Sequence, residues 1–351
     1  MPTIAAYGAI DPTSPLKPLN IERREPDADD VVIDITHCGV CHSDMHFARN
    51  DLGFTRYPIV PGHEIVGRVS RVGSNVNRFS PGDRVAVGCI VNSCQSCPSC
   101  EASLEQYCDK GIVGTYGGLD PKENGAPTHG GYSRMIVVDH RFVLRVPENL
   151  DPAATAPLLC AGVTTWSPLR EWNVGKGQTV GVIGLGGLGH MGVKFAHALG
   201  AHVVMVTTSP AKGEDAKSLG ADDVLLSTDA NAMRANSGRF DFLLNTIPVG
   251  HNINPYLKLL KRDGTMVLVG PLEPLEGHLH SMLMLTRRRR IAGSMIGGIK
   301  ETQEMLDFCG EHNIVADIEV INMNEINTAY SRMEKNDIKY RFVIDMASLT
   351  D

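Results

Sequence analysis

The sequence contains no apolar run long enough to span a bilayer, and its first eight residues hold no basic segment followed by an apolar one. Neither a membrane anchor nor a secretory signal is therefore expected, and cytoplasm is the predicted location. Internal repeats and low-complexity segments are also absent. Positive charge is not in excess, because the formal net charge is -7. Nucleic acid and anionic membranes gain nothing from such a surface, so neither is expected as a partner.

The length and composition of the chain are those of an ordinary globular protein. The 351 residues are 42% hydrophobic and 21% charged, which suffices for a sizeable core and is long enough for two domains. There are nine cysteines. Without a secretion signal, these are better explained as metal ligands and buried thiols than as disulfides.

The first part of the chain predicts an irregular, mostly antiparallel β-domain. Turn residues such as Ser80-Pro-Gly-Asp83 separate its strands. The predicted strands are 31–36, 65–72, 84–88 and 132–138.

After Asp151 and Pro152 the pattern changes to apolar strands that alternate with helices. Such strands predict a parallel sheet covered on both faces. They are expected at 179–184, 202–207, 223–226, 240–245, 265–270 and 291–294. The remaining tail, with helices at 300–312 and from Asn324 and strands near Ile318 and at 341–345, is too short for a domain and is expected to fold back onto the first. The basic run 287–290 is interpreted as a solvated helix end rather than a nucleic-acid site.

Four cysteines, Cys94, Cys97, Cys100 and Cys108, form the strongest motif. Four thiolates close a tetrahedron and leave no open position, which is typical of structural zinc. An iron–sulfur cluster uses similar spacing, and chance clustering is the remaining alternative. Structural zinc is preferred because a closed set in a loop stabilises a lobe that has no core.

A second set consists of Cys41, His63 and Cys160. Catalytic zinc prefers three protein ligands of mixed type and an open position. Glu64, next to His63, is a candidate further ligand. Asp44 is expected to accept a hydrogen bond from the ring of His63 and so hold its tautomer.

Ser43 and His46 suit a proton relay that leads from the metal site toward solvent. The alternative for both is capping or packing. The other thiols, Cys38, Cys89 and Cys309, are expected to be merely buried.

A glycine-rich turn follows the strand at 179–184 and opens a helix. Its five motif residues are Gly184, Gly186, Gly187, Leu188 and Gly189. In this context the pattern predicts a dinucleotide site, with the pyrophosphate at the helix N-terminus.

The end of the next strand has no Asp or Glu to bind a ribose hydroxyl. Thr208, Ser209 and Lys212 stand there instead and fit a 2′-phosphate, which favours NADP(H) over NAD(H). An ordinary strand-to-helix turn with an N-cap is the alternative.

Together these motifs resemble the zinc-containing medium-chain dehydrogenase/reductase family, and within it the NADP(H)-dependent aldehyde reductases similar to cinnamyl alcohol dehydrogenase. The resemblance covers nearly the whole chain. Its motifs are 39–44, 60–67, 94–108, 157–165, 184–189, 293–306 and 341–345.

The resemblance implies an α/β two-domain fold. A GroES-like, β-rich zinc catalytic domain would comprise 1–153 and 295–351, and a Rossmann domain with a doubly wound parallel sheet would comprise 154–294. It also implies an active site in the cleft and a homodimer built through the Rossmann sheets. By position, Thr164 matches a nicotinamide contact and Arg341 a pyrophosphate contact.

One departure concerns the substrate pocket. Gly114 and Met295 stand where plant cinnamyl enzymes carry bulky aromatics, which implies a wider, less selective pocket. The predicted function is zinc-dependent, reversible reduction of many aldehydes to primary alcohols with NADPH. The alternatives are a narrower cinnamyl or aromatic alcohol dehydrogenase, possibly NAD-linked, and a scaffold protein that keeps zinc only for structure. Intact ligand sets argue against the scaffold.

Overall fold

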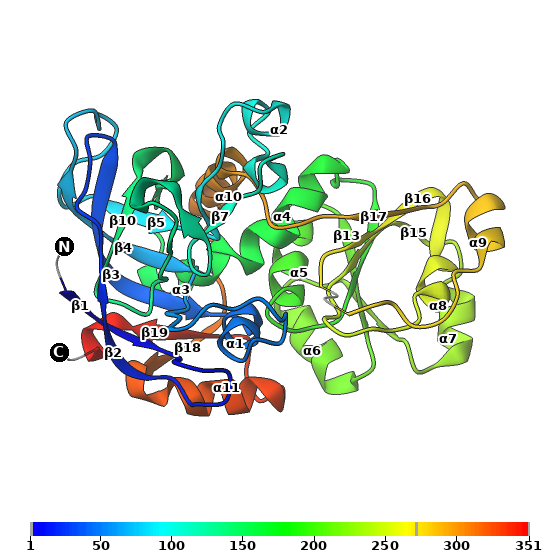
Figure 1. Cartoon of the computed structure of the whole chain (residues 1–351). Helices are drawn as coiled ribbons and strands as arrows, with labels where there is room; N and C mark the ends of the chain where they lie inside the picture. The colour runs from blue at the N-terminus through cyan, green and yellow to red at the C-terminus, as the bar shows by residue number, and fades with distance from the viewer. Residues whose placement is uncertain (1–2, 271–272, 350–351) are drawn as a thin grey trace. The chain divides into compact units, whose positions relative to one another are not determined.

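The structure is a computed structural model that describes residues 3–270 and 273–349 (Figure 1). The chain forms two compact units, one from Met1–Cys160 with Gly297–Asp351 and one from Ala161–Ile296. Each unit is described by itself. Among the described residues, no helix has the length and apolar character needed to cross a bilayer.

A seven-stranded sheet forms the centre of the first unit, in the order β11-β5-β4-β3-β19-β18, with β10 also paired to β3. All these pairings are antiparallel except that of β18 with β19. The strands are β3 (Asp30–Val40), β4 (Ile65–Val72), β5 (Arg84–Val87), β10 (Met135–Asp139), β11 (Leu144–Arg145), β18 (Ile318–Asn322) and β19 (Arg341–Asp345). The tail therefore folds back onto the first part of the chain, as predicted.

Short pairs of strands and short helices complete this unit. The paired strands are β1 (Thr3–Gly8) with β2 (Lys17–Glu22), β6 (Ile90–Asn92) with β7 (Val113–Gly114), and β8 (Leu119–Asp120) with β9 (Ala126–Pro127). The helices are α1 (His42–Ala48), α2 (Pro98–Glu101), α3 (Pro152–Thr155), α10 (Ile299–His312) and α11 (Ile326–Glu334). Single 3-10 turns lie at η1 (Glu105–Tyr107), η2 (Pro121–Glu123), η3 (His140–Phe142), η4 (Ala156–Leu159), η5 (Met323–Glu325) and η6 (Met346–Ser348).

The second unit is built on a six-stranded, fully parallel sheet in the order β14-β13-β12-β15-β16-β17. Its strands are β12 (Thr179–Ile183), β13 (His202–Thr207), β14 (Asp223–Leu226), β15 (Phe240–Asn245), β16 (Leu260–Leu268) and β17 (Arg290–Gly293). Its helices are α4 (Ala161–Glu171), α5 (Gly189–Ala198), α6 (Pro210–Ser218), α7 (Ala230–Ala235), α8 (Asn254–Leu257) and α9 (Ser281–Leu285). Helices α5 and α6 pack on strands β12 to β14 (Figure 1). Buried residues such as Val204, Phe240 and Leu243 form a core that also includes Leu257 of α8, as near-continuous apolar strands require.

The basic run 287–290 follows α9, and Arg287, Arg288 and Arg290 are exposed, as predicted for a solvated helix end. The exception is Arg289, which is only 8% exposed. Its guanidinium donates to the carbonyls of Lys258, Leu260 and Leu283. A buried guanidinium that bonds three carbonyls ties the turn after α9 to the start of β16, which the sequence pattern did not reveal.

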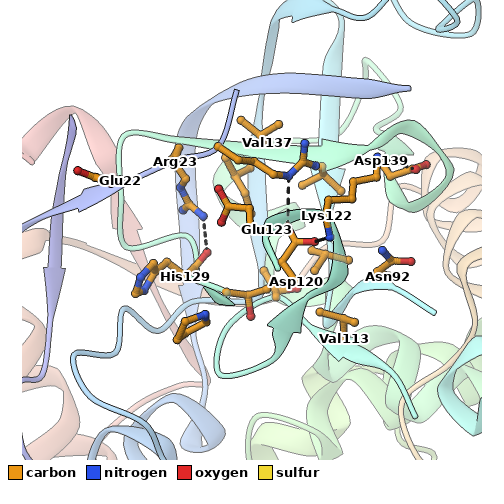
Figure 2. Close-up of a pocket in the computed structure, with 17 residues that line it drawn as sticks. Glu22, Arg23, Asn92, Val113, Asp120, Lys122, Glu123, His129, Val137 and Asp139 are labelled. Atoms are coloured by element: carbon orange, nitrogen blue, oxygen red, sulfur yellow. Dashed lines mark hydrogen bonds and ion pairs between the residues drawn. The ribbon is translucent and has the colours of Figure 1, made fainter. Parts of the chain in front are cut away.

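A polar cavity of about 40 Å³ lies in the first unit, beside the β8–β9 pair (Figure 2). Beside it, Lys122 Nζ lies 3.0 Å from Asp30 Oδ1 and 3.2 Å from Asp139 Oδ2, while Arg24 pairs with Asp30 and Asp120. We call these five residues the charged cluster. It anchors the β8–β9 turn to strands β3 and β10, because Asp30 and Asp139 lie on those strands.

His129 also lines the cavity, and its protonation should make stability depend on pH. Burial, together with the charge of Arg23, lowers the pKa of His129 from 6.5 to about 4. The unfolded chain therefore binds a proton that the folded chain does not. Above about pH 6.5, His129 is neutral in both states and does not reduce the free energy of unfolding. As the pH drops from 6.5 toward about 4, the free energy of unfolding decreases, and about 2 kcal/mol is lost at pH 5.

We expect His129→Gln to show a smaller loss of unfolding free energy than the wild type between about pH 7 and pH 5. Urea titrations at the two pH values measure this loss. The exposed His312 provides a control, because His312→Gln should keep the wild-type pH dependence. An unchanged pH dependence in His129→Gln would contradict the assignment.

Candidate active site

Four buried side chains converge in the first unit: Cys41, His63, Glu64 and Cys160. One donor atom of each lies within 4.8 Å of all the others. The sulfurs of Cys41 and Cys160 are 3.9 Å apart. Two sulfurs bound to one tetrahedral zinc at about 2.3 Å lie about 3.8 Å apart, so the donor set fits zinc.

Local structure explains how distant residues meet here. Strand β3 ends at Val40, and Cys41 is the N-cap of α1. The Asp44 Oδ2 accepts a hydrogen bond of 2.8 Å from the Cys41 amide, which closes a capping box and fixes the first turn. His63 and Glu64 immediately precede β4, beside the end of β3. Cys160 follows the turn η4.

Glycine at position 39 is required by this arrangement. Its amide donates to the Glu64 carbonyl at 2.9 Å, so the two backbones lie close together. A Cβ on Gly39 would overlap the Glu64 Oε2. Any other residue at this position would displace the carboxylate from the donor set.

The ring of His63 is held through one nitrogen. His63 Nδ1 lies 3.2 Å from Asp44 Oδ1, so Asp44 is in contact with the ring as expected. The same nitrogen is 3.1 Å from the hydroxyl of Tyr116. Both contacts leave Nε2 as the nitrogen available to a metal. The sequence analysis did not predict Tyr116 as a site residue. Its only indication was its position two residues after Gly114, which was assigned to the substrate pocket.

Glu64 is fully buried and pairs through Oε1 with the Arg341 guanidinium. Among residues 3–270 and 273–349, Glu64 Oε2 has no hydrogen-bond partner. Burial raises the pKa of Glu64 to about 8, although the charge of Arg341 opposes this shift. Arg341, which the resemblance matches to a pyrophosphate contact, is itself buried against Glu64 at the start of β19.

The two relay residues both lie on α1. Ser43 Oγ is 3.7 Å from the Cys41 sulfur, so its hydroxyl is beside the metal set. His46 is partly exposed, and its Nδ1 is 2.8 Å from Asp51 Oδ2. The relay between them stays a prediction.

The second cysteine set lies in residues 93–112, which we call the cysteine lobe. The sulfurs of Cys94, Cys97, Cys100 and Cys108 lie within 4.8 Å of one another, and those of Cys94 and Cys100 are 3.9 Å apart. Backbone amides point at these sulfurs, including that of Asp109 at 3.5 Å from Cys97. A backbone hydrogen bond at Ser96 is the main cause that lowers the pKa of Cys94 to about 6. Backbone hydrogen bonds lower the pKa of Cys97 as well, whereas burial raises the pKa of Cys100 to about 11. The spacing of the four sulfurs fits a closed zinc site.

Apart from the cysteines, the apolar cluster of the lobe contains only Ile112. The lobe is attached to the rest of the unit through Glu105, whose carboxylate accepts a 3.0 Å hydrogen bond from the Ile299 amide. That amide belongs to the first residue of α10. The lobe thus supplies an acceptor to a helix N-terminus, where negative charge is favourable.

All nine cysteines are free thiols, as predicted. Cys38 and Cys309 are buried as expected, but the prediction for Cys89 was wrong. Cys89 is only half-buried, and its sulfur lies 3.7 Å from the Leu159 carbonyl, next to Cys160. Strand β5 ends two residues earlier, so Cys89 lies in the chain after the strand and stays partly exposed.

The glycine-rich turn between β12 and α5 has the predicted form. Gly184 has a φ of +92°, which favours glycine. A Cβ on Gly189 would overlap the Gly184 carbonyl oxygen, and nothing lies within 4 Å of one on Gly186. Sequence reasoning missed Thr246, whose hydroxyl donates to the carbonyls of Ile183 at 2.9 Å and Gly184 at 3.1 Å. Gly187 and Leu188 complete the turn, and Leu188 is the N-cap of α5.

Thr208 and Ser209 follow the end of β13. Ser209 Oγ accepts a hydrogen bond from the Lys212 amide at 3.4 Å, so Ser209 is also the N-cap of α6. Thr208 is exposed and Lys212 half-buried. Within the described ranges, no side chain pairs with the Lys212 ammonium, which leaves a cation at the strand end. Thr164, the predicted nicotinamide contact, is buried in α4.

Comparisons with known proteins agree with this geometry. Residues 27–148 match the alcohol dehydrogenase GroES-like domain, and residues 187–311 match the zinc-binding dehydrogenase family. The aldehyde reductase YahK of Escherichia coli is 57% identical over 351 residues, which cover 99% of each chain. The chain belongs to the zinc-binding alcohol dehydrogenases. The predicted family, fold class and oxidoreductase class are thereby confirmed.

Two solved structures of this alcohol dehydrogenase family are also similar. A cinnamyl alcohol dehydrogenase of Sorghum bicolor matches with a TM-score of 0.95, 45% identity and 100% coverage of both chains. A Helicobacter pylori protein described as CAD complexed with NADP(H) matches with a TM-score of 0.90, 40% identity and 99% coverage of both.

Proposed function

We propose that this alcohol dehydrogenase reduces a broad range of aldehydes to primary alcohols, reversibly, with NADPH as hydride donor. The observation that carries the proposal is the buried Cys41, His63 and Cys160 set, whose sulfur spacing fits zinc. The similarity of the chain to an aldehyde reductase supports aldehydes as the substrate class.

Each residue of the site has a role in this proposal. Cys41, His63 and Cys160 hold the catalytic zinc, with Glu64 as a further ligand. When bound, zinc polarises the carbonyl oxygen as a Lewis acid. Ser43 donates a proton to the oxygen that becomes the alcohol, and His46 restores that proton from solvent. Cys94, Cys97, Cys100 and Cys108 hold the structural zinc.

Dinucleotide binding is assigned mainly to residues of the second unit. The motif 184–189 receives the pyrophosphate, and Thr208, Ser209 and Lys212 receive the 2′-phosphate. Thr164 contacts the nicotinamide, and Arg341 contributes to the pyrophosphate site. Residues 154–294 are the proposed Rossmann domain, and 1–153 with 295–351 the catalytic domain. The similarity to a protein solved with NADP(H) supports the choice of cofactor.

The test is consumption of NADPH, and in parallel NADH, by the zinc-loaded protein with a panel of aliphatic and aromatic aldehydes. Turnover of many aldehydes with NADPH is expected, because Gly114 leaves room where related enzymes carry an aromatic. Turnover confined to cinnamyl and other aromatic aldehydes would favour the narrower alternative. No turnover with either cofactor would favour the scaffold.

Lys212→Ala should separate the two cofactors. Losing the ammonium removes a charge-assisted contact to the 2′-phosphate that NADH does not carry. We expect the Kd for NADPH to rise about 10- to 100-fold and that for NADH to stay within about twofold. Fluorescence titration measures both. Lys217→Ala, on the same helix with its ammonium paired to Glu214, should leave both unchanged. Equal losses for the two cofactors would contradict the assignment.

We also propose a cytoplasmic homodimer. Within the described part of the chain, β17 is the end strand of its sheet and has no neighbour on its outer side. Nearby on α9, Met282 and Leu285 are 62% and 72% exposed. An open strand edge beside exposed apolar side chains suits pairing with a second copy. Light scattering of the purified protein tests this, and a monomer would contradict it.

A further inference from the structure

Tyr116 stands between the metal set and an aromatic cluster of the first unit. Its side chain is 6% exposed, and its hydroxyl lies 3.1 Å from His63 Nδ1. The Tyr116 and His63 rings are 5.5 Å apart between centroids, and Phe47 packs edge-on against Tyr116 at 5.1 Å. Phe47 in turn packs edge-on against Phe54. The hydroxyl is therefore directed by packing on both sides of its ring.

The hydroxyl meets the Asp44 carboxylate at one nitrogen of the His63 ring. Asp44 Oδ1 lies 3.2 Å from His63 Nδ1, the nitrogen that the Tyr116 hydroxyl also contacts. The other partners of Asp44 are the amides of Cys41 and Gly62 and the hydroxyl of Tyr132 at 3.2 Å. Asp44 is thus fixed by the backbone, whereas the ring of His63 is fixed by Asp44 and Tyr116 together.

We propose that Tyr116 is a positioning residue for the catalytic metal: its hydroxyl and Asp44 together hold the His63 ring with Nε2 directed at the metal. The inference rests on the proposed function, in which His63 is a zinc ligand. An imidazole ligand that is held by two partners keeps both its tautomer and the orientation of its ring. Mutation of a residue that hydrogen-bonds to a metal ligand typically lowers metal affinity about 10- to 100-fold.

The segment that carries Tyr116 is itself braced. Thr115 donates to the Gly88 carbonyl, and the Gly117 amide donates to the Thr128 carbonyl at 3.1 Å. Beyond these bonds the chain enters the β8–β9 pair, which the charged cluster anchors. His129, at the far end of the segment, offers its carbonyl to the buried Arg23 at 2.7 Å. A segment fixed at both ends holds the Tyr116 hydroxyl at a constant place.

The experiment follows zinc release from the purified holoenzyme into excess chromogenic chelator. Tyr116→Phe keeps the ring and its packing and removes only the hydroxyl. Tyr132→Phe is the matched control, because it removes a buried hydroxyl that contacts Asp44 Oδ2 and not His63. The cysteine lobe is an internal control, since its zinc has no contact with Tyr116. Absorption spectra of the cobalt-substituted proteins report the ligand field independently of activity.

We expect Tyr116→Phe to release one of its two zinc ions about 10- to 100-fold faster than the wild type, with the other unchanged and the cobalt bands shifted. Tyr132→Phe should change release by less than about threefold. Wild-type release in Tyr116→Phe would overturn the inference, as would equal acceleration in both variants, which would place the effect on Asp44. A wild type that holds only the lobe zinc would instead refute the proposed function itself.

Discussion

Replacing Cys41 by serine should lower aldehyde turnover by at least about a thousandfold. Lewis-acid polarisation by zinc contributes several kcal/mol to the transition state, and each 1.36 kcal/mol corresponds to about a factor of ten in rate. A serine hydroxyl is a far poorer zinc ligand than a thiolate. The zinc content should fall from two ions to one per chain, with the remaining ion in the cysteine lobe.

Steady-state rates with NADPH and metal analysis of the same preparation check this result. Cys309→Ser is the control, because it also replaces a buried thiol but lies in α10, outside both ligand sets. It should keep two zinc ions and turnover within about threefold of the wild type. Retained turnover in Cys41→Ser would refute the metal assignment, and a protein with no zinc would show that the two sites are not independent.

The second large effect is expected from Cys100→Ser, which opens the cysteine lobe. In the lobe, metal coordination takes the place of an apolar core, so the free energy of metal binding contributes directly to folding. In zinc-finger peptides, the free energy of zinc binding is roughly 10–16 kcal/mol. Loss of the ion should unfold residues 93–112 and release Glu105 from the start of α10. We expect a stability loss of several kcal/mol, a lower Tm and rapid proteolytic cleavage within the lobe.

Ser99→Ala, in the same short helix, tests whether any change in the lobe has this effect. It removes no ligand and should keep two zinc ions and the wild-type Tm. Differential scanning calorimetry and limited proteolysis compare the variants. A Cys100→Ser protein with wild-type Tm and resistance to cleavage would show that the lobe folds without its metal.

Residue patterns predicted the helices, the strands and both sets of metal ligands because the interactions that determine them are mostly between residues close in sequence. Alternation predicted β4 with the bounds it has, and runs of apolar residues predicted β13, β14 and β15 with theirs. Cysteine spacing predicted the lobe for the same reason, since the four ligands lie in one short segment. Cys160 was harder, because it is 119 residues from Cys41, and only its position before the dinucleotide motif indicated it.

Features that depend on contacts between distant segments did not follow from the sequence. Tyr116 is 53 residues from His63, and no local pattern distinguishes it from a core tyrosine. Arg289 was interpreted as solvated because nothing in a basic run reveals that one guanidinium meets three carbonyls. Cys89 was taken as buried because the strand pattern does not show that the chain just after β5 remains partly exposed.

The order of strands in the first sheet also determines when the surroundings of Glu64 are completed during synthesis. Strand β19 lies between β3 and β18, and Arg341, the ion-pair partner of Glu64, is its first residue. During synthesis, this strand leaves the ribosome only after the whole second unit, which can fold first as a unit. The ion pair that holds Glu64 can therefore form only after the second unit has been made, although Cys41, His63, Glu64 and Cys160 all precede that unit.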